Sequence, residues 1–257
     1  MKILLQSNIW DEYEYDRFCT SLVDEGIDCS FADVIPFTDN FVQEIDFVPS
    51  YVFGSGRFIN ICRAKGFPTF PSFAPIELDL IPSHHWINGD GYKCKWRDLN
   101  IDSPKFIKPF TEKFFTGVLV ESQDDLQKIQ LATSFIEEEG DEDIWVANPV
   151  HIKTEVRFFV LYGQIITASF YKMNGIGHHL QIDHYHPAWE ACDRILKDWG
   201  REGCNANVCR PDIDGFVIDL GLCDDTWKVV ELNNLNSSGI YKCDTDAIAR
   251  VLKLFGK

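Results

Sequence analysis

Two pairs of apolar segments in the second half of the chain, each divided by a short turn, constrain its fold more than any other feature. The segments are residues 155–162 with 164–171 and residues 215–222 with 227–232. Gly163 divides the first pair, and the acidic turn Asp224-Asp225 divides the second. Apolar runs of this length with turn residues between them are typical of β-hairpins. We therefore predict that this half of the chain forms antiparallel β-sheet.

Further strand and helix patterns flank these two hairpins. Strands are expected at residues 2–9, 105–108, 114–120 and 144–152, and helices at residues 11–22, after residue 122, at 187–199 and at 244–255. Ser122-x-x-Asp125 is a capping-box pattern, which marks the start of a helix. The second and third of these strands lie close enough in sequence to pair as a hairpin. Pro149 places the fourth strand at a sheet edge or at a bend.

The first part of the chain differs in character from the rest. Alternating strand and helix signals over about 80 residues predict a small α/β unit. Residues 81–103 are polar and irregular, with a proline and two glycines, and they predict a long connection or a domain boundary. We therefore expect a mixed α/β (α+β) fold with two domains, residues 1–85 and residues 86–257.

The charge of the chain limits the kinds of partner that it can bind. It has 40 Asp and Glu against 24 Lys and Arg, so its formal net charge is −16. A strong excess of acid argues against broad binding to a nucleic-acid backbone. Small anionic ligands held by a few well-placed cations remain open. A hydrophobic fraction of 45% is ample for a packed core and excludes a disordered chain.

The sequence also predicts a compartment. No apolar run approaches the roughly 18 residues that a membrane span requires. The first residues, Met1 to Gln6, turn polar too soon for a secretory signal. The nine cysteines are scattered and no pair has CxxC spacing. We expect most of them to be reduced, buried thiols in a cytoplasmic protein.

Three oxygen-bearing side chains lie on the last two predicted strands. Asp219 is on the first strand, and Glu231 and Asn233 are on the second. Because side chains two residues apart in a strand share a face, Glu231 and Asn233 project together, and Asp219 can face them from the neighbouring strand. Two carboxylates and an amide oxygen form a hard oxygen site. Such a site suits Mg²⁺, which commonly uses one or two carboxylates plus substrate phosphates.

Four basic residues are candidates for binding phosphate or other anions. Lys108 ends a strand just before Pro109, and Lys113 follows it closely. Arg157 lies inside an apolar run, where a charge normally needs a partner. Its planar fork suits phosphate, although an ion pair with Glu155 or another acid is an alternative. Arg210 precedes the strand of Asp219, where it either binds an anion or pairs with a neighbouring aspartate at the surface.

Several motifs together resemble the ATP-grasp superfamily, and most of all its compact R2K-type branch. The motifs are Lys108-Pro109, Lys113-Phe114-Phe115-Thr116-Gly117, Glu155-x-Arg157-Phe158-Phe159-Val160, Asp219, Glu231-Leu232-Asn233 and Ser238-Gly239-Ile240-Tyr241. Their order and approximate spacing agree with that branch, over about residues 104–244. The resemblance implies an ATP-grasp fold preceded by a small N-terminal α/β domain.

The resemblance also implies roles for these residues. Lys108 and Lys113 would bind ATP phosphates, and Arg157 would contact phosphate or stabilise transferred charge. Asp219, Glu231 and Asn233 would hold one or two Mg²⁺. The segment from Trp145 through Val146 to Val150 would form the adenine hinge, partly through backbone groups.

Four histidines near the middle hairpin invite a second interpretation. They are His178, His179, His184 and His186. Zinc binding would need a further ligand at familiar spacing, and none is present, so a polar loop on the substrate side is favoured. Tyr171 and Lys172 end a strand beside this segment, and they and Ser238 are candidates for contact with the substrate.

The resemblance implies an ATP-dependent carboxylate–amine ligase that acts through an acyl phosphate with Mg²⁺. The expected substrates are small-molecule or peptide-like carboxylates and amines. Two alternatives share the fold: a kinase-like phosphotransferase and a nucleotide-binding module without turnover. The sequence does not predict the oligomeric state.

Overall fold

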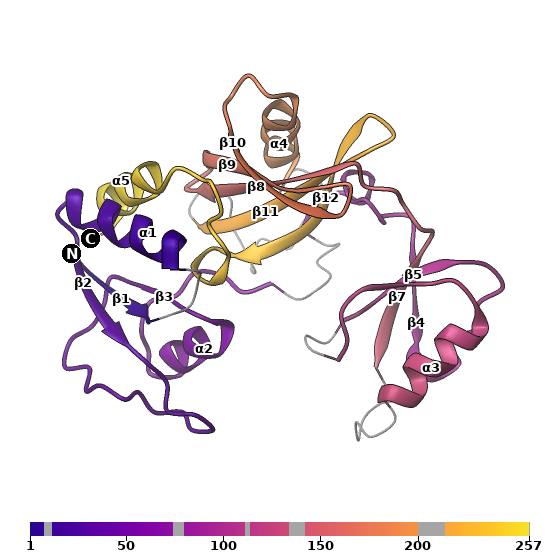
Figure 1. Ribbon diagram of the computed structural model, residues 1–257, viewed down its shortest axis with the longest axis horizontal. Coiled ribbons are helices and arrows are strands. Elements are labelled where there is room, and N and C mark those ends of the chain that lie inside the picture. Colours follow the sequence, from indigo (N-terminus) through magenta and orange to yellow (C-terminus); the bar gives the residue numbers. More distant parts are fainter. Residues whose placement is uncertain (8–11, 74–79, 111–113, 134–141, 200–213, 257) are drawn as a thin grey trace.

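The computed structural model describes residues 1–7, 12–73, 80–110, 114–133, 142–199 and 214–256. Within these ranges the chain forms three sheets that follow one another along an arch (Figure 1). A parallel sheet occupies the indigo end, a five-stranded antiparallel sheet forms the middle, and a four-stranded antiparallel sheet occupies the magenta end. The fold is therefore mixed α/β, as the sequence predicts.

The N-terminal unit is a small parallel sheet with helices packed against it. Its strands, in the order β2-β1-β3, are β2 (Asp28–Ala32), β1 (Lys2–Gln6) and β3 (Tyr51–Phe53), and its helices are α1 (Glu12–Asp24) and α2 (Gly56–Ala64). Ile3, Leu4 and Leu5 are all buried. A continuous apolar run is expected for the central strand of a parallel sheet, because helices cover both of its faces.

The central sheet contains both predicted hairpins. Its strands, in the order β10-β9-β8-β11-β12, are β10 (Ile176–Ile182), β9 (Gln164–Met173), β8 (Thr154–Leu161), β11 (Gly215–Cys223) and β12 (Thr226–Asn234). Tyr162 and Gly163 join β8 to β9, and Asp224 and Asp225 join β11 to β12. All four have positive φ, between 45° and 77°. Two consecutive left-handed residues form the turn that matches strand twist, so the turn residues fix both registers.

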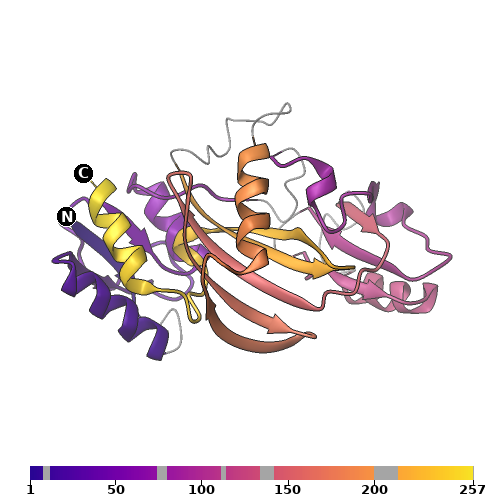
Figure 2. The ribbon, with the colours of Figure 1, turned by 90° about the horizontal axis from the view of Figure 1, so that it is seen from above.

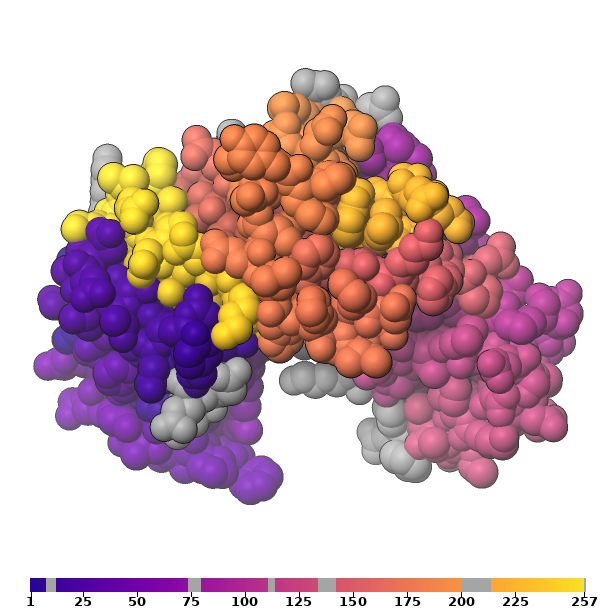
Figure 3. Space-filling view, turned by 45° about the horizontal axis from the view of Figure 1, so that its top comes forward, coloured from indigo at the N-terminus to yellow at the C-terminus, as the bar shows by residue number. Residues whose placement is uncertain are grey.

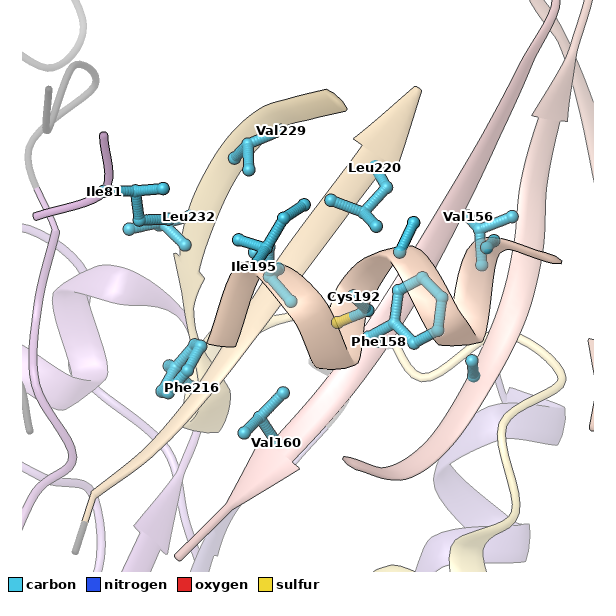
Figure 4. Close-up of a cluster of buried hydrophobic side chains, with 14 of the residues drawn as sticks. Ile81, Val156, Phe158, Val160, Cys192, Ile195, Phe216, Leu220, Val229 and Leu232 are labelled. Carbon is cyan, nitrogen blue, oxygen red and sulfur yellow. The ribbon is translucent and has the colours of Figure 1, made fainter. Parts of the chain in front are cut away.

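The central sheet is covered on both faces. Alternate side chains along β8 point to opposite faces of the sheet and so lie in two different environments. Val156, Phe158 and Val160 pack against α4 (Pro187–Asp198), whose Cys192 and Ile195 face the strands (Figure 4). Figure 2 looks down on α4 as it crosses the sheet. The side chains between them, such as Arg157 and Phe159, point to the opposite face.

A smaller sheet forms the magenta end of the arch. Its strands, in the order β4-β7-β5-β6, are β4 (Tyr92–Lys95), β7 (Asp143–Ala147), β5 (Lys105–Pro109) and β6 (Val118–Val120), and it carries α3 (Gln123–Thr133). The predicted hairpin of β5 and β6 is confirmed. Ser122 precedes α3, and its Oγ accepts a hydrogen bond from the amide of Asp125 at 3.2 Å. The edge position suggested for β7 is wrong: β7 lies between β4 and β5, and Pro149 follows its end.

Two polar segments have more structure than the sequence predicts. Residues 81–103, expected to be a connection, include β4, the short 3₁₀ helices η1 (Ser83–His85) and η2 (Trp96–Asp98), and the buried Trp86 and Trp96. The expected loop around His178 and His179 is strand β10, which pairs with β9. Strands β4 and β10 carry few buried side chains, so they lack the apolar pattern that identifies a strand.

The last helix returns to the N-terminal unit. Helix α5 (Thr245–Phe255) lies beside α1, and the two ends of the chain lie close together (Figures 1 and 2). The Oγ of Ser21 donates to the Oγ1 of Thr245 at 2.8 Å. Phe18 of α1, Phe159 of β8 and Leu252 of α5 share one hydrophobic core. The division at residue 85 stays a prediction.

Three further observations concern the shape, the helices and the cysteines of the described chain. The space-filling view shows an indentation between the indigo and magenta ends of the arch (Figure 3). None of the helices in the described ranges has the length and apolarity needed to cross a bilayer. The seven cysteines in those ranges are free thiols, four of them buried.

Candidate active site

A cavity of about 360 Å³ lies between the central and the smaller sheet. The smaller sheet contributes Phe106, Lys108, Leu119 and Trp145, and the central sheet contributes Glu155, Tyr171, Lys172, Val230 and Glu231. The segment between β7 and β8 closes one side with Pro149, Val150 and Ile152. Most of this lining is apolar, and a few charged groups converge on it. Such a lining suits a ligand that has both a ring system and charges.

Arg157 and Asp219 form a buried, bidentate ion pair next to the cavity. They face each other in the register of β8 and β11. Arg157 Nε donates to Asp219 Oδ1 at 2.9 Å, and Nη2 donates to Oδ2 at 2.7 Å. Arg157 is 7% exposed and Asp219 is fully buried. Burial therefore leaves each charge dependent on the other. The acid that pairs with Arg157 is therefore Asp219 rather than Glu155.

Asp219, Glu231 and Asn233 converge on one point. Asp219 lies opposite Glu231 in the register of β11 and β12. The Nδ2 of Asn233 donates to Asp219 Oδ2 at 3.0 Å and to Glu231 Oε1 at 3.1 Å. Two carboxylate oxygens from adjacent strands therefore face a single position. The sequence predicts this grouping, and the register of the hairpin produces it.

Lys108 faces this group from the other sheet. Its Nζ is 3.7 Å from Glu231 Oε2, and its side chain is 21% exposed. Burial raises the pKa of Glu231, but Lys108, Asn233 and Arg157 outweigh that effect, so the net shift is downward. Burial raises the pKa of Asp219 to about 6 despite Arg157, and the negative charge of Glu231 adds to the increase. Two cations therefore face two carboxylates, and burial rather than an excess of negative charge is the main reason that the pKa of Asp219 is raised.

The donor set of the site fits a divalent cation. Two carboxylates and one amide are the hard oxygen ligands that Mg²⁺ uses. Their oxygens already converge on one donor, the Asn233 amide, and a half-turn of that amide presents its Oδ1 to the same position. Within the described ranges no three His, Cys, Asp or Glu side chains group as a metal site. A cation here would therefore take its remaining ligands from substrate or water.

Comparison with known proteins identifies the family of the chain. The family model of the ATP-grasp domain, R2K clade family 2, matches residues 91–251. The chain belongs to this family. The match covers the smaller sheet, the central sheet and most of α5, and so includes both walls of the cavity.

Solved ATP-grasp structures share the fold over nearly the whole chain. A RimK domain ATP-grasp protein from Sphaerobacter thermophilus DSM 20745 has a TM-score of 0.64 at 13% identity, covering 97% of this chain and 98% of that one. D-alanine–D-alanine ligase from Bacillus anthracis, complexed with ATP, has a TM-score of 0.56 at 14% identity, covering 98% and 92%. The ATP-grasp ligase PsnB, complexed with minimal precursor, has a TM-score of 0.56 at 12% identity, covering 98% of both chains. No curated protein matches the chain.

The predicted hinge of the ATP-grasp domain only partly lines the cavity. Trp145 does so, and its Nε1 donates to the carbonyl of Asn88 at 3.0 Å. Val146 has a fully buried side chain in the core of the smaller sheet and does not reach the cavity. Pro149 and Val150, which continue the segment, do reach it.

The substrate candidates Tyr171 and Lys172 lie together with a carboxylate. The Oη of Tyr171 donates a short hydrogen bond to Glu155 Oε2, and the Nζ of Lys172 is 3.5 Å from Glu155 Oε1. Burial and the surrounding carboxylates raise the pKa of Tyr171, so it remains a neutral donor. Ser238 does not line the cavity: it is buried, and its Oγ donates to the carbonyl of Asn234 at 2.7 Å. Lys113 and Arg210 lie outside the described residues.

The structure adds contacts that the sequence does not predict. Glu155 lines the cavity, and its motif offers a signal, because a carboxylate at an alternate strand position shares the face of Arg157. Tyr241 stacks on Tyr171, with ring centroids 5.7 Å apart and an interplanar angle of 7°. Glu14 and Arg17 of α1 bind the segment that carries Tyr241. Tyr241 belongs to the motif Ser238-Gly239-Ile240-Tyr241, but no local pattern identifies Glu14 or Arg17, because their contacts join the two ends of the chain.

Proposed function

We propose that this ATP-grasp protein is an ATP-dependent ligase that joins a carboxylate to an amine through an acyl phosphate, with Mg²⁺. The observation that carries the proposal is the junction of an apolar cavity with a charged group. Lys108 and Glu231 line the cavity, and Asp219 and Asn233 contact Glu231 from behind it. A nucleotide has the matching division, with a flat base at one end and phosphates at the other.

The proposed nucleotide site uses both sheets. The adenine ring would lie among Trp145, Val150 and the other apolar lining residues. Lys108 would bind phosphate oxygens as a point charge, at the wall facing Glu231. Lys172, on the same cavity, would bind a phosphate or the carboxylate substrate.

Asp219, Glu231 and Asn233 would hold Mg²⁺ together with the phosphates. The ion supplies charge neutralisation and orients the terminal phosphate for transfer. Arg157 holds Asp219 in position through two hydrogen bonds. A guanidinium has five N–H groups, and three of those on Arg157 have acceptors among the described residues. The remaining two N–H groups are proposed to stabilise the transferred phosphoryl group.

The proposed reaction has two steps. A carboxylate oxygen of the first substrate attacks the γ-phosphorus, the bond from that phosphorus to the bridging oxygen breaks, and ADP leaves. The amine of the second substrate then attacks the acyl carbon, phosphate leaves, and the nitrogen loses a proton. In both steps the protein contributes position and fixed charge rather than covalent chemistry.

The proposed substrates are small-molecule or peptide-like acids and amines. Two similar folds belong to proteins named as ligases, D-alanine–D-alanine ligase and PsnB, and they support this class.

We also propose that the protein is cytoplasmic, because the seven described cysteines are free thiols.

Hydroxylamine tests the proposed chemistry without knowledge of the natural amine. A panel of amino acids, short peptides and organic acids is incubated with Mg-ATP and hydroxylamine, and ADP and hydroxamate are measured. The proposal predicts equal amounts of both, dependent on one class of acid. The Glu231→Ala variant should form neither, and the Glu190→Ala variant, altered at an exposed glutamate on α4, should behave as wild type.

Two results would contradict the ligase. ADP formed together with a phosphorylated product that resists hydroxylamine would indicate the phosphotransferase. Mg-ATP binding with no ADP from any acid in the panel would favour a nucleotide-binding module.

A further inference from the structure

The segment that follows β12 is held in place by helix α1 of the N-terminal unit. Arg17 Nη1 donates to the carbonyl of Tyr241 at 2.9 Å, and Nη2 donates to the carbonyl of Cys243 at 2.7 Å. Glu14 Oε2 accepts a hydrogen bond from the amide of Ile240 at 3.0 Å. Glu14 and Arg17 are three residues apart, so they share one face of the helix. Both side chains bind backbone groups, which fixes the path of the segment whatever its sequence.

This segment has a conformation that needs such support. Tyr241 has a φ of 52°, in the left-handed region that a bulky residue rarely occupies. Strained backbone of this kind persists only where its surroundings determine it. Ser238 fixes the other end of the segment through its hydrogen bond to the carbonyl of Asn234 on β12. In Figures 1 and 2 the yellow chain after β12 lies beside α1.

The held segment in turn contacts Arg157. The carbonyl of Gly239 accepts a hydrogen bond from Arg157 Nη1 at 3.3 Å. The rings of Tyr241 and Tyr171 are stacked, and the Arg157 guanidinium carbon lies 5.1 Å and 5.2 Å from their centroids. Each distance is within the range of a cation–π interaction. Arg157 therefore has two kinds of support, Asp219 on its own sheet and the segment held by α1.

We propose that Glu14 and Arg17 are positioning residues for the site: by fixing the segment from Ser238 to Cys243, they hold Arg157 in register with Asp219. The N-terminal unit thereby sets the geometry of the phosphate end of the site without touching the nucleotide. The catalytic half of this inference rests on the proposed function. The structural half, a clamp between α1 and the segment, stands apart from it.

Two matched pairs of variants test the inference. Arg17→Lys and Arg17→Met break the two-carbonyl clamp, and Arg57→Met is the control. Arg57 lies on α2 of the same unit and also donates to a backbone carbonyl, that of Thr38 at 2.7 Å, far along the chain from the segment. Glu14→Met, which removes the acceptor for the amide of Ile240, is paired with Glu25→Met, because Glu25 pairs with Arg250 and Lys253 of α5 rather than with the segment.

Amide hydrogen exchange gives the readout that needs no nucleotide. In Arg17→Met we expect exchange at residues 239–243 to be at least about tenfold faster, with global unfolding little changed. Arg17→Lys, which keeps a positive charge but has one nitrogen in place of the two that bind the carbonyls, should fall between Arg17→Met and wild type. Unchanged exchange in Arg17→Met would overturn the clamp.

Kinetics give the second readout. We expect kcat for ATP turnover to fall about 10- to 100-fold in Arg17→Met, with the Kd for Mg-ATP within about twofold of wild type. An unchanged kcat, or an equal fall in Arg57→Met, would overturn the positioning role. If the wild-type protein shows no turnover, the proposed function and the catalytic half of this inference are both wrong. Faster exchange at residues 239–243 in Arg17→Met would still support the clamp.

Discussion

The two sheets that bound the cavity contribute in different ways. The central sheet supplies Arg157, Asp219 and Glu231, which contact one another through a fixed strand register. The smaller sheet supplies a single charged lining residue among those described, Lys108, and otherwise apolar or neutral side chains. The central sheet therefore holds a fixed arrangement of charged side chains. The smaller sheet covers that arrangement and adds one cation, Lys108.

Burial accounts for this division. The central sheet has α4 on one face and a second core, shared with α1 and α5, on the other. Charges between two covered faces must be paired, and pairing across adjacent strands gives them one arrangement. The smaller sheet packs its core against α3, which leaves its other face to line the cavity. Changes in the central sheet should therefore affect chemistry and stability, and changes in the smaller sheet should affect binding.

Glu231 provides the strongest test of this comparison. Glu231→Ala should lower Mg²⁺-dependent ATP turnover by about 10³-fold or more, because it removes a carboxylate from the proposed cation site. Its side chain is 36% exposed, so the fold should remain intact by circular dichroism. Steady-state kinetics with coupled detection of ADP measure the effect. Normal turnover in this variant would show that Glu231 is not a metal ligand.

Asp219 tests the claim that the central sheet also depends on its charges for stability. Asp219→Ala leaves Arg157 buried and unpaired, so the free energy of unfolding should fall by about 3–5 kcal/mol in urea titrations. The double variant Arg157→Met/Asp219→Leu removes both charges and should recover most of the loss. A double variant no more stable than Asp219→Ala would show that the pair itself, not the unpaired charge, determines stability.

Lys108 tests the contribution of the smaller sheet. Lys108→Ala should raise the Kd for Mg-ATP about 10- to 100-fold, as expected for loss of one charge-assisted contact. Its free energy of unfolding should change by less than about 1 kcal/mol, since its pair with Glu231 is partly exposed. Equilibrium dialysis measures the affinity. Lys95→Ala is the control, because Lys95 pairs with Asp143 on the same sheet and does not line the cavity.

His186 gives the smallest effect and concerns the helix that covers the central sheet. It caps α4, and its Nδ1 accepts the amide of Ala188 at 3.2 Å, which requires a neutral ring. Burial lowers its pKa below the usual 6.5, so the folded state binds the proton less well than the unfolded state. The contribution of the cap is therefore present above pH 6.5 and is lost as the pH falls below it.

The change His186→Asn makes this effect measurable. Asparagine caps helices without titrating, so unfolding curves between pH 7 and 5 should vary less with pH than those of wild type. His186→Ala should cost about 1 kcal/mol at pH 7. Equal pH dependence in wild type and His186→Asn would show that another group titrates.

The sequence predicts the central sheet better than the smaller one, for a physical reason. The turn residues Gly163 and Asp224-Asp225 determine two hairpins locally, and the second hairpin places Asp219 opposite Glu231. Pairing of β8 with β11 then places Arg157 opposite Asp219. The convergence of Asp219, Glu231 and Asn233 is predictable from their spacing alone.

What the sequence does not predict depends on distant contacts or on weak patterns. Strands β4 and β10 carry mostly exposed side chains, so no apolar alternation distinguishes them from loops. Glu14 and Arg17 lie 226 residues from Ile240 and Cys243, and only the return of α5 to α1 brings them near. Val146 looks equivalent to Trp145 in the hinge segment, but strand alternation turns it into the core.

Calorimetric titration with Mg-ATP tests directly whether the two sheets form one nucleotide site with a cation at Asp219, Glu231 and Asn233. The wild type, Lys108→Ala and Glu231→Ala are titrated with ATP in Mg²⁺ and in a chelator. We expect one bound ATP per chain in the wild type, with binding weakened by the chelator and by either substitution. Absence of binding by folded wild-type protein, or equal binding in all three proteins with and without Mg²⁺, would contradict it.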